Sequence, residues 1–182
     1  MKTLFHSNGK LLITAEYFVL AGAKALAVPS QYGQSLHYKR EDQNCLLWNS
    51  FDHQGEIWYK GEFELENLLE KGAQKTKIGS KLTQILQATR VLNPSFLSHG
   101  GQVDTHLEFD RHWGLGSSST LISNISKWAK VNPFNLLDIT FGGSGYDISC
   151  ASAKSAIHYT KNEVTPEVVP VSFNPPFASN LF

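Results

Sequence analysis

The chain has 182 residues, of which 41% are hydrophobic and 18% charged, so it has enough apolar side chains to fold around a core. Its 16 basic and 16 acidic residues give a formal net charge of zero, which excludes bulk attraction to nucleic acid as its main means of binding. The two cysteines, Cys45 and Cys150, lie far apart and form neither a disulfide framework nor a zinc motif.

The N-terminal region carries polar residues where a signal peptide or a membrane span would be apolar. Residues 1–6 lack the apolar core of a signal peptide. The apolar stretch 11–29 contains Thr14, Glu16 and Lys24, whose polar groups disfavour a membrane environment. We therefore expect a cytoplasmic protein that does not bind membranes.

In the same region, short apolar runs alternate with turn signals. Residues 3–6 and 11–14 are predicted strands. The Ser7-Asn8-Gly9 sequence between them is typical of a turn, because Asn and Gly both tolerate positive φ. Residues 25–28 predict a further strand, which Pro29 should end.

The middle of the chain shows period-two alternation and then helical periodicity. Alternation predicts antiparallel strands with one wet face, two of them joined by a hairpin loop at residues 52–55. Apolar residues between Ile78 and Val91 recur at helical spacing, which predicts an amphipathic helix that ends at Asn93-Pro94. A short helix is expected at 63–69 and an exposed loop at 71–75. The predicted strands are residues 34–39, 45–51, 56–60 and 101–109.

Two glycine-rich segments each precede a predicted helix in the second half of the chain. The first, residues 114–119, lies between the strand at 101–109 and an amphipathic helix that runs to Ala129. The second, residues 141–145, precedes Tyr146 and Asp147 and an apolar segment of small residues. The remaining predicted elements are a short helix at 134–140 and terminal strands at 156–159 and 167–173.

The first glycine-rich segment has the properties of an anion site. Backbone amides at a helix start are unpaired, the helix dipole is positive there, and glycine lets a ligand approach the backbone. A phosphate loop is the functional interpretation, and a serine-capped turn is the common structural alternative. The segment is neither a Walker A motif nor a dinucleotide fingerprint, since Ser119 stands where the latter has its third glycine.

Three separated features would together supply the parts of phosphoryl transfer: Lys10, the loop at 114–119 and Asp147. Amides and a cation offset phosphate charge, a hydroxyl or carboxylate holds a metal, and a carboxylate takes the proton of the acceptor hydroxyl. Taken singly, a turn lysine is usually solvated and an aspartate before a helix is usually an N-cap. Glu16 is a carboxylate in an apolar region, so it needs either a partner or a functional role.

In this order the three motifs resemble those of the GHMP kinase superfamily, the small-molecule kinases named for galactokinase, homoserine kinase, mevalonate kinase and phosphomevalonate kinase. Residues 7–17 look like the first motif, with Asn8 in place of the usual proline and Ala15 in place of the usual glycine. Residues 114–119 match the phosphate-loop motif closely. Gly143-Ser144-Gly145-Tyr146-Asp147 is nearest to the phosphomevalonate kinases and to bacterial proteins with a Gly-Tyr-Asp-Ile-Ala sequence.

The resemblance implies a role for each of these residues. The phosphate loop would wrap the phosphates of ATP with backbone amides, and Ser118 would face Mg²⁺. Asp147 would be the catalytic base, with Lys10 beside it. Some members use an upstream glutamate as a metal ligand; only Asp138 lies near that place, and it is not assigned. The other implied residues are Glu16 and Tyr17 near the acceptor, and Gly114, Leu115, Gly116, Ser117 and Ser119 at the phosphates.

The resemblance also implies an α+β fold. Residues 1–173 would form the ATP-binding domain, which has a left-handed β-α-β unit like the second domain of ribosomal protein S5. Residues 174–182 would begin a C-terminal ferredoxin-like domain that is largely absent. A cleft that lacks one wall should bind the acceptor poorly, and the bare apolar surface favours a homodimer.

The leading hypothesis is therefore an ATP- and Mg²⁺-dependent kinase of a small metabolite, most like mevalonate or phosphomevalonate kinase. The alternative is a truncated, non-catalytic nucleotide-binding module. A nucleic-acid binder on an S5-like fold is disfavoured, because the net charge is zero and there is no basic stripe.

Overall fold

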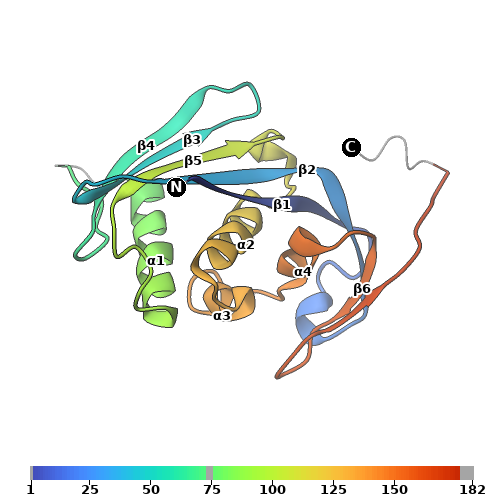
Figure 1. The fold of residues 1–182 in the computed structure, drawn as a ribbon. Helices are drawn as coiled ribbons and strands as arrows, with labels where there is room; N and C mark the ends of the chain where they lie inside the picture. Colours follow the sequence, from blue (N-terminus) through green and yellow to red (C-terminus); the bar gives the residue numbers. More distant parts are fainter. Residues whose placement is uncertain (1, 73–75, 177–182) are drawn as a thin grey trace.

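The computed structural model describes residues 2–72 and 76–176, in which one mixed sheet carries its α-helices on one face (Figure 1). Two 3₁₀ helices, Val19–Ala21 and Arg111–Trp113, lie in its connections. The α-helices are α1 (Lys77–Leu92), α2 (Ser117–Ala129), α3 (Pro133–Asp138) and α4 (Tyr146–Ser152). The strands are β1 (Lys2–Leu12), β2 (Ala25–Arg40), β3 (Cys45–Phe51), β4 (Ile57–Glu64), β5 (Gly101–Leu107), β6 (Ile157–Thr160) and β7 (Glu167–Pro170).

Strand β2 organises the sheet because it pairs with three others. The order is β4-β3-β5-β2-β6-β7, and β1 pairs with the free side of β2. β5 pairs with residues 34–40 of β2, and β6 pairs with residues 25–27. All these pairs are antiparallel except β3 with β5, which is parallel, so the expectation of antiparallel strands holds only in part.

Two predicted breaks in the N-terminal strands are wrong. Residues 7–9 form no turn, because β1 runs from Lys2 to Leu12 with an irregularity between Asn8 and Lys10. Pro29 does not end β2. It lies between the parts of β2 that pair with β6 and with β5, where β1 is the only neighbouring strand. A missing amide donor is tolerated where one side of a strand is open.

The short helix predicted at 63–69 is also wrong. Phe63 and Glu64 belong to β4, and Phe63 is fully buried and bridges to Glu70. Leu68 has a left-handed φ of 60°, which a helix does not allow. Part of the loop predicted at 71–75 lies outside the described residues, since residues 73–75 are not described.

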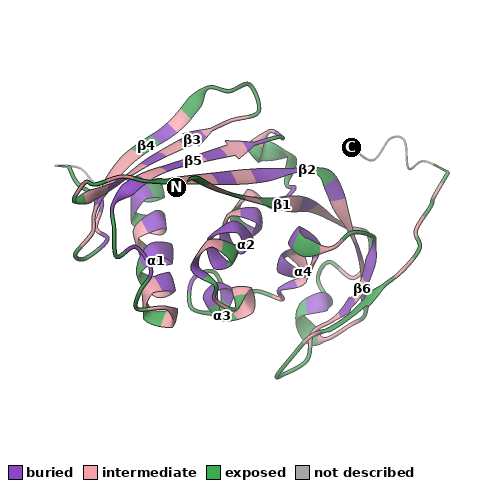
Figure 2. Ribbon diagram, viewed as in Figure 1, coloured by how far each residue is buried: buried purple, intermediate pink, exposed green. Residues whose placement is uncertain are grey.

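The main core lies between the sheet and the helices, as the buried segments in Figure 2 show. β5 alternates strictly between buried and half-buried residues, as the sequence predicts. The helix predicted between Ile78 and Val91 is confirmed as α1, which buries Leu82, Ile85 and Leu86 and ends at Leu92, with Asn93 as its C-cap. Each such side chain contributes roughly 1.5 to 3 kcal/mol by leaving water.

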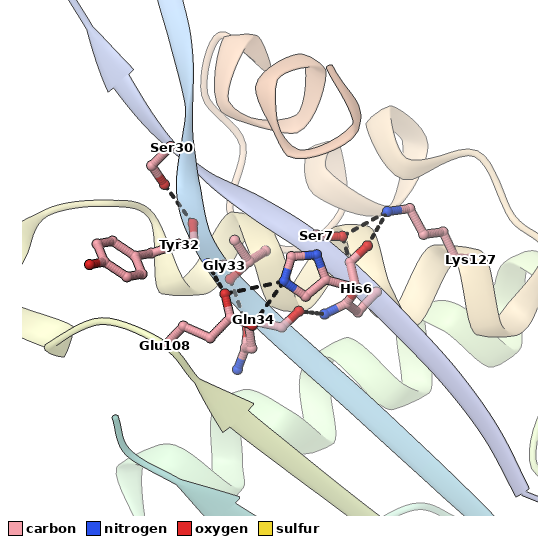
Figure 3. A network of polar contacts seen from close by, with 10 residues as sticks. His6, Ser7, Ser30, Tyr32, Gly33, Gln34, Glu108 and Lys127 are labelled. Atoms are coloured by element: carbon pink, nitrogen blue, oxygen red, sulfur yellow. Dashed lines mark hydrogen bonds and ion pairs between the residues drawn. The ribbon is translucent and has the colours of Figure 1, made fainter. Parts of the chain in front are cut away.

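Helix α2 is attached to the sheet by hydrogen bonds as well as by apolar contacts. The hydroxyl of Ser7 lies 2.8 Å from both Ser123 Oγ and Asn124 Oδ1 and accepts from Lys127 Nζ at 2.9 Å. Lys127 also donates to the backbone oxygen of His6 at 2.7 Å (Figure 3). Asn124 Nδ2 donates to the backbone oxygen of Gln34 at 2.7 Å. We call Ser7, Gln34, Ser123, Asn124 and Lys127 the polar seam.

A second set of contacts fixes the chain just after β5. Glu108 accepts a hydrogen bond from the amide of Gly33 at 2.7 Å and lies 3.2 Å from His6 Nε2 (Figure 3). A Cβ on Gly33 would lie 2.3 Å from the backbone oxygen of Ser7, so only glycine allows β1 to approach β2 here. These contacts fix the direction in which the chain enters the segment before α2.

Candidate functional site

The start of α2 leaves backbone amides open. Gly114 and Gly116 both adopt left-handed φ, of 73° and 85°, and the N-cap Gly116 supplies no side-chain cap. The first backbone hydrogen bond of the helix runs from the amide of Thr120 to the oxygen of Gly116 at 3.0 Å. The amides of residues 117–119 lie ahead of this bond in the chain. Ser119 Oγ donates to the same oxygen at 2.8 Å, which keeps this buried hydroxyl inside the loop. The geometry suits an anion at the amides.

Strand β1 lies against this loop because two glycines lack a Cβ. A Cβ on Gly9 would lie 2.9 Å from the backbone oxygen of Leu115, and one on Gly116 would lie 2.6 Å from Ser119 Oγ. The backbone amide of Lys10 donates to the oxygen of Leu115 at 3.0 Å. The glycine of the predicted Asn8-Gly9 turn therefore serves close approach between β1 and the loop.

Lys10 connects the two glycine-rich segments. Its ammonium donates to the backbone oxygen of Gly114 at 2.9 Å. It also lies 5.6 Å from the centre of the Tyr146 ring, within the range of a cation–π contact. The structure thus brings the first and second motifs together with the start of α4.

Asp147 lies half-buried in the first turn of α4. Burial raises the pKa of its carboxyl, while the amide of Ile148, which donates to Oδ1 at 3.0 Å, and the charge of Lys10 oppose the rise. Burial raises the pKa of Tyr146 to about 12, and the charge of Asp147 adds to the effect. A carboxylate that is poorly solvated and faces a cation has the character of a general base.

The glycine-rich loop before α4 is held from three sides. The hydroxyl of Tyr159 donates to the oxygen of Ser144, and Lys161 Nζ donates to the oxygen of Gly143 at 3.2 Å. Gly145 has a φ of 83°, and a Cβ there would lie 3.1 Å from the ring of Phe134. These contacts fix the position at which α4, and therefore Asp147, begins.

The two residues predicted near the acceptor are both exposed. The charge of Glu16 contributes to the raised pKa of Tyr146, which places Glu16 on the same side of the molecule as the site. Tyr17 is 85% exposed, and within residues 2–72 and 76–176 no hydrogen bond, ion pair or ring contact links it to Lys10 or Asp147. Ala15, where the GHMP motif has glycine, adopts a left-handed φ of 66°.

The predicted metal contact stays a prediction. Ser118 is exposed at the start of α2. Within residues 2–72 and 76–176, no three His, Cys, Asp or Glu side chains cluster as a metal site would require. Mg²⁺ bound with a nucleotide usually takes one or two protein ligands and otherwise phosphate and water oxygens. Burial raises the pKa of Tyr159 to about 12, and the charges of Asp147 and Asp138 add to the effect. No metal role is assigned to Asp138.

A cavity of about 420 Å³ adjoins the loop, and sequence reasoning missed it. It lies between α1 and α2 on the helix-covered face of the sheet. Because residues from separate elements form it, no single sequence motif predicts it. Ser117 and Ser118 line it beside the phosphate loop. Its other lining residues include apolar Trp58, Ile78, Leu82, Ile85, Leu107, Leu121 and Phe141, cationic Lys77, Lys81 and Arg111, and polar Gln34, Ser50 and Thr105.

Solved structures resemble the chain, whereas no protein-family model and no curated protein sequence matches it. Mevalonate kinase from Methanococcus jannaschii matches with a TM-score of 0.70 at 12% identity, over 95% of this chain and 56% of that one. Galactokinase from Lactococcus lactis, solved with galactose, matches with a TM-score of 0.69 at 16% identity, over 95% and 48%. A D-glycero-D-manno-heptose 1-phosphate kinase from Bacteriodes thetaiotaomicron matches with a TM-score of 0.65 at 11% identity, over 96% and 61%.

The chain therefore spans about half the length of the solved structures that it matches. Among the described residues, no helix has the length and apolar character that crossing a membrane would require. At such low identities the likeness shows the fold. The predicted resemblance is confirmed at that level: the chain has the mixed α/β fold of the N-terminal portion of the GHMP kinases.

Proposed function

We propose that the chain is the ATP-binding part of a GHMP-type kinase that transfers the γ-phosphate of ATP to a small metabolite. The observation that carries the proposal is the position of Lys10. Its ammonium bonds the phosphate-loop carbonyl of Gly114 and lies 5.6 Å from the centre of the Tyr146 ring, next to Asp147 in the chain. Three motifs that are far apart in the sequence therefore meet at one cation, as phosphoryl transfer requires.

Each residue has a role that its surroundings support. The open amides of residues 117–119 would bind the phosphates of ATP, and the exposed hydroxyl of Ser118 would reach the Mg²⁺ that accompanies them. Bound Mg²⁺ would neutralise phosphate charge. Asp147 would accept the proton of the acceptor hydroxyl, and Lys10 would stabilise the negative charge that develops between donor and acceptor.

The cavity beside the loop would hold the nucleoside part of ATP. It is apolar along most of its wall, and Ser117 and Ser118 line it, so a nucleotide with its phosphates on the loop would extend into it. The positive charges of Lys77, Lys81 and Arg111 would favour an anionic ligand there.

The acceptor would be a small hydroxylated or phosphorylated metabolite. Three of the proteins of similar fold are kinases of mevalonate, galactose and a heptose phosphate by name, so the fold leaves several acceptors open. The Gly-Tyr-Asp segment favours mevalonate or phosphomevalonate. Residues 1–173 would form the ATP-binding domain. Residues 174–182 would begin the next domain, although residues 177–182 lie outside the described part of the chain.

The test compares wild type with Asp147→Asn on this chain and on the longest natural form of the protein. Phosphate transfer from ATP to mevalonate, phosphomevalonate and galactose is measured together with ATP affinity. We expect the substitution to lower turnover by about 10²- to 10⁴-fold while ATP affinity stays the same. Asp42→Asn, at an exposed position, is the control. Normal turnover by Asp147→Asn would show that the proposed base is wrong.

The alternative, a nucleotide-binding module without transferase activity, is favoured by one observation: the chain spans about half the length of the kinases it resembles. It predicts that ATP binds in both forms and that neither form phosphorylates any acceptor. Phosphorylation by the 182-residue chain that depends on Asp147 would exclude it.

A further inference from the structure

The cavity beside the phosphate loop is lined by the side-chain amide of Gln34, whose nitrogen is open to the cavity. Gln34, on β2, is only 3% exposed and lines the cavity. Its Oε1 accepts from Thr120 Oγ1 at 2.8 Å, and its backbone oxygen accepts from Asn124 Nδ2 at 2.7 Å. In the described parts of the chain, no group accepts a hydrogen bond from Nε2. Among the described residues the fully buried side-chain atoms without a partner are Thr3 Oγ1 and Trp58 Nε1, so Nε2 of Gln34 is reached from the cavity. The Nε2 group is therefore available to a ligand.

Two further buried polar groups lie on the sheet side of the cavity. Ser50 on β3 and Thr105 on β5 are register partners and are 4% and 1% exposed. Ser50 Oγ accepts from Trp48 Nε1 at 3.1 Å and from Thr105 Oγ1 at 3.0 Å. The hydrogen of Ser50 then remains to donate, and the lone pairs of Thr105 remain to accept. We call Gln34, Ser50 and Thr105 the cavity floor, which offers both donors and an acceptor.

The walls above the floor are mostly apolar, with the cations Lys77, Lys81 and Arg111 and the unpaired N–H of Trp58 among them. They are formed by α1, by α2 and by the indole of Trp58, on which the guanidinium of Arg111 stacks at 4.1 Å. A cavity with apolar walls and a few convergent polar groups fits a flat heteroaromatic ring whose edge carries both ring nitrogens and an exocyclic group. A saturated apolar ligand would leave the floor unpaired.

We propose that Gln34 reads the edge of the nucleotide base, with its Nε2 group donating to a ring nitrogen of adenine. The hydroxyls of Ser50 and Thr105 meet the same edge, where the lone pairs of Thr105 accept from the exocyclic amino group. The inference rests on the proposed function, because it requires the phosphates to lie on residues 114–119. It goes beyond that function by naming the residue that selects the base. Guanine carries an N–H at the ring position where adenine has this acceptor nitrogen. Guanine would therefore leave the Nε2 group of Gln34 unpaired.

The test swaps the donor for an acceptor at this one atom. Gln34→Glu keeps an oxygen for Thr120 and replaces Nε2 by a second oxygen, and Gln34→Met removes both polar atoms at similar size. Affinities for ATP, GTP and inorganic tripolyphosphate are measured by calorimetry. Gln31→Glu, at an exposed position of the same strand, is the matched control.

We expect Gln34→Met to weaken ATP binding about tenfold, the effect of roughly one hydrogen bond to the base. Tripolyphosphate affinity should not change, which also shows that the loop is still folded. Gln34→Glu should lower the ratio of ATP to GTP affinity by at least about tenfold, because its carboxylate repels the ring nitrogen of adenine and accepts from guanine. Gln31→Glu should change none of these values.

The outcomes separate the two proposals. If wild type binds neither ATP nor tripolyphosphate, the proposed function fails and the base-reading role falls with it. If wild type binds ATP and both Gln34 variants keep its affinity and its ATP-to-GTP ratio, the base-reading role is wrong while the proposed function stands. A parallel loss of ATP and tripolyphosphate affinity would show that Gln34 supports the loop instead of the base.

Discussion

The ammonium of Lys10 lies 2.9 Å from the backbone oxygen of Gly114, the first glycine of the phosphate loop. The backbone amide of Lys10 donates to the next carbonyl, that of Leu115, at 3.0 Å. One residue of β1 is therefore bonded twice to the segment that starts α2, through its side chain and its backbone. The backbone bond survives any substitution except proline, so the function of the ammonium can be tested separately.

Lys10→Met should lower turnover by about 10²- to 10³-fold, because a methionine keeps the apolar stem and removes the charge beside the reacting groups. The midpoint of thermal unfolding should change little. Initial rates and ATP affinity are measured on the catalytically competent form of the protein. Lys24→Met, at an exposed position, is the control and should behave as wild type. An unchanged kcat in Lys10→Met would remove this lysine from the mechanism.

Gly116→Ala and Gly55→Ala separate backbone strain from damage to the site. The two glycines have nearly the same φ, 85° and 84°, so both alanines should cost about 1 to 2 kcal/mol in the free energy of unfolding. Gly116→Ala should cost more, because its Cβ would lie 2.6 Å from Ser119 Oγ and 3.2 Å from Lys10 Cε, whereas Gly55 has open space. Denaturant titration and ATP binding measure both effects. Equal stabilities together with normal ATP affinity in Gly116→Ala would contradict the geometry.

Asp147→Asn should raise the thermal midpoint at neutral pH. Burial raises the pKa of this carboxyl in the folded protein, so the ionised form is disfavoured there. The cost is absent below the unfolded-state pKa, grows as pH rises through the folded-state pKa and is complete above it. Asparagine keeps the oxygen that accepts from Ile148 and removes the charge. Thermal midpoints of the two proteins should therefore differ at about pH 7.5 and converge near pH 4. A difference that is largest in acid would contradict the sign.

Ala15→Gly should stabilise the protein by about 1 kcal/mol. Ala15 has a φ of 66°, a conformation that costs an L-residue with a side chain about 1 to 2 kcal/mol, part of which the larger unfolded-state entropy of glycine offsets. Its backbone oxygen accepts from Phe18 and Val19, which fixes the turn. Ala21→Gly in the following 3₁₀ helix is the control and should destabilise. Chemical denaturation measures both, and a loss of stability in Ala15→Gly would show that the strain is compensated elsewhere.

How much of the structure could be predicted depends on whether the signal is local. The periodicity of α1 and the alternation of β5 lie within single segments, and both elements are confirmed. The turn expected at Asn8-Gly9 and the stop expected at Pro29 were wrong because pairing with a distant strand decides both. Tertiary context overrides local propensity at such positions.

The site divides in the same way. The order of the motifs indicated that Lys10, the loop and Asp147 belong together, and the structure places the first two in direct contact. The cavity could not be predicted, because Gln34, Ser50 and Thr105 come from three strands and each looks like an ordinary polar residue in the sequence. Alternation does predict that all three face one side of the sheet, but it does not predict which face the helices cover.

The polar seam has a mechanical consequence for the phosphate loop. Apolar contacts are not directional, so hydrogen bonds fix the position of a helix along its axis more strictly than apolar contacts alone. Ser7, Asn124 and Lys127 form hydrogen bonds that a shift of α2 along its axis would break together. The seam thus sets how far the first turn of α2 projects toward Lys10, through contacts about two helical turns from the open amides and three residues from Lys10 along β1.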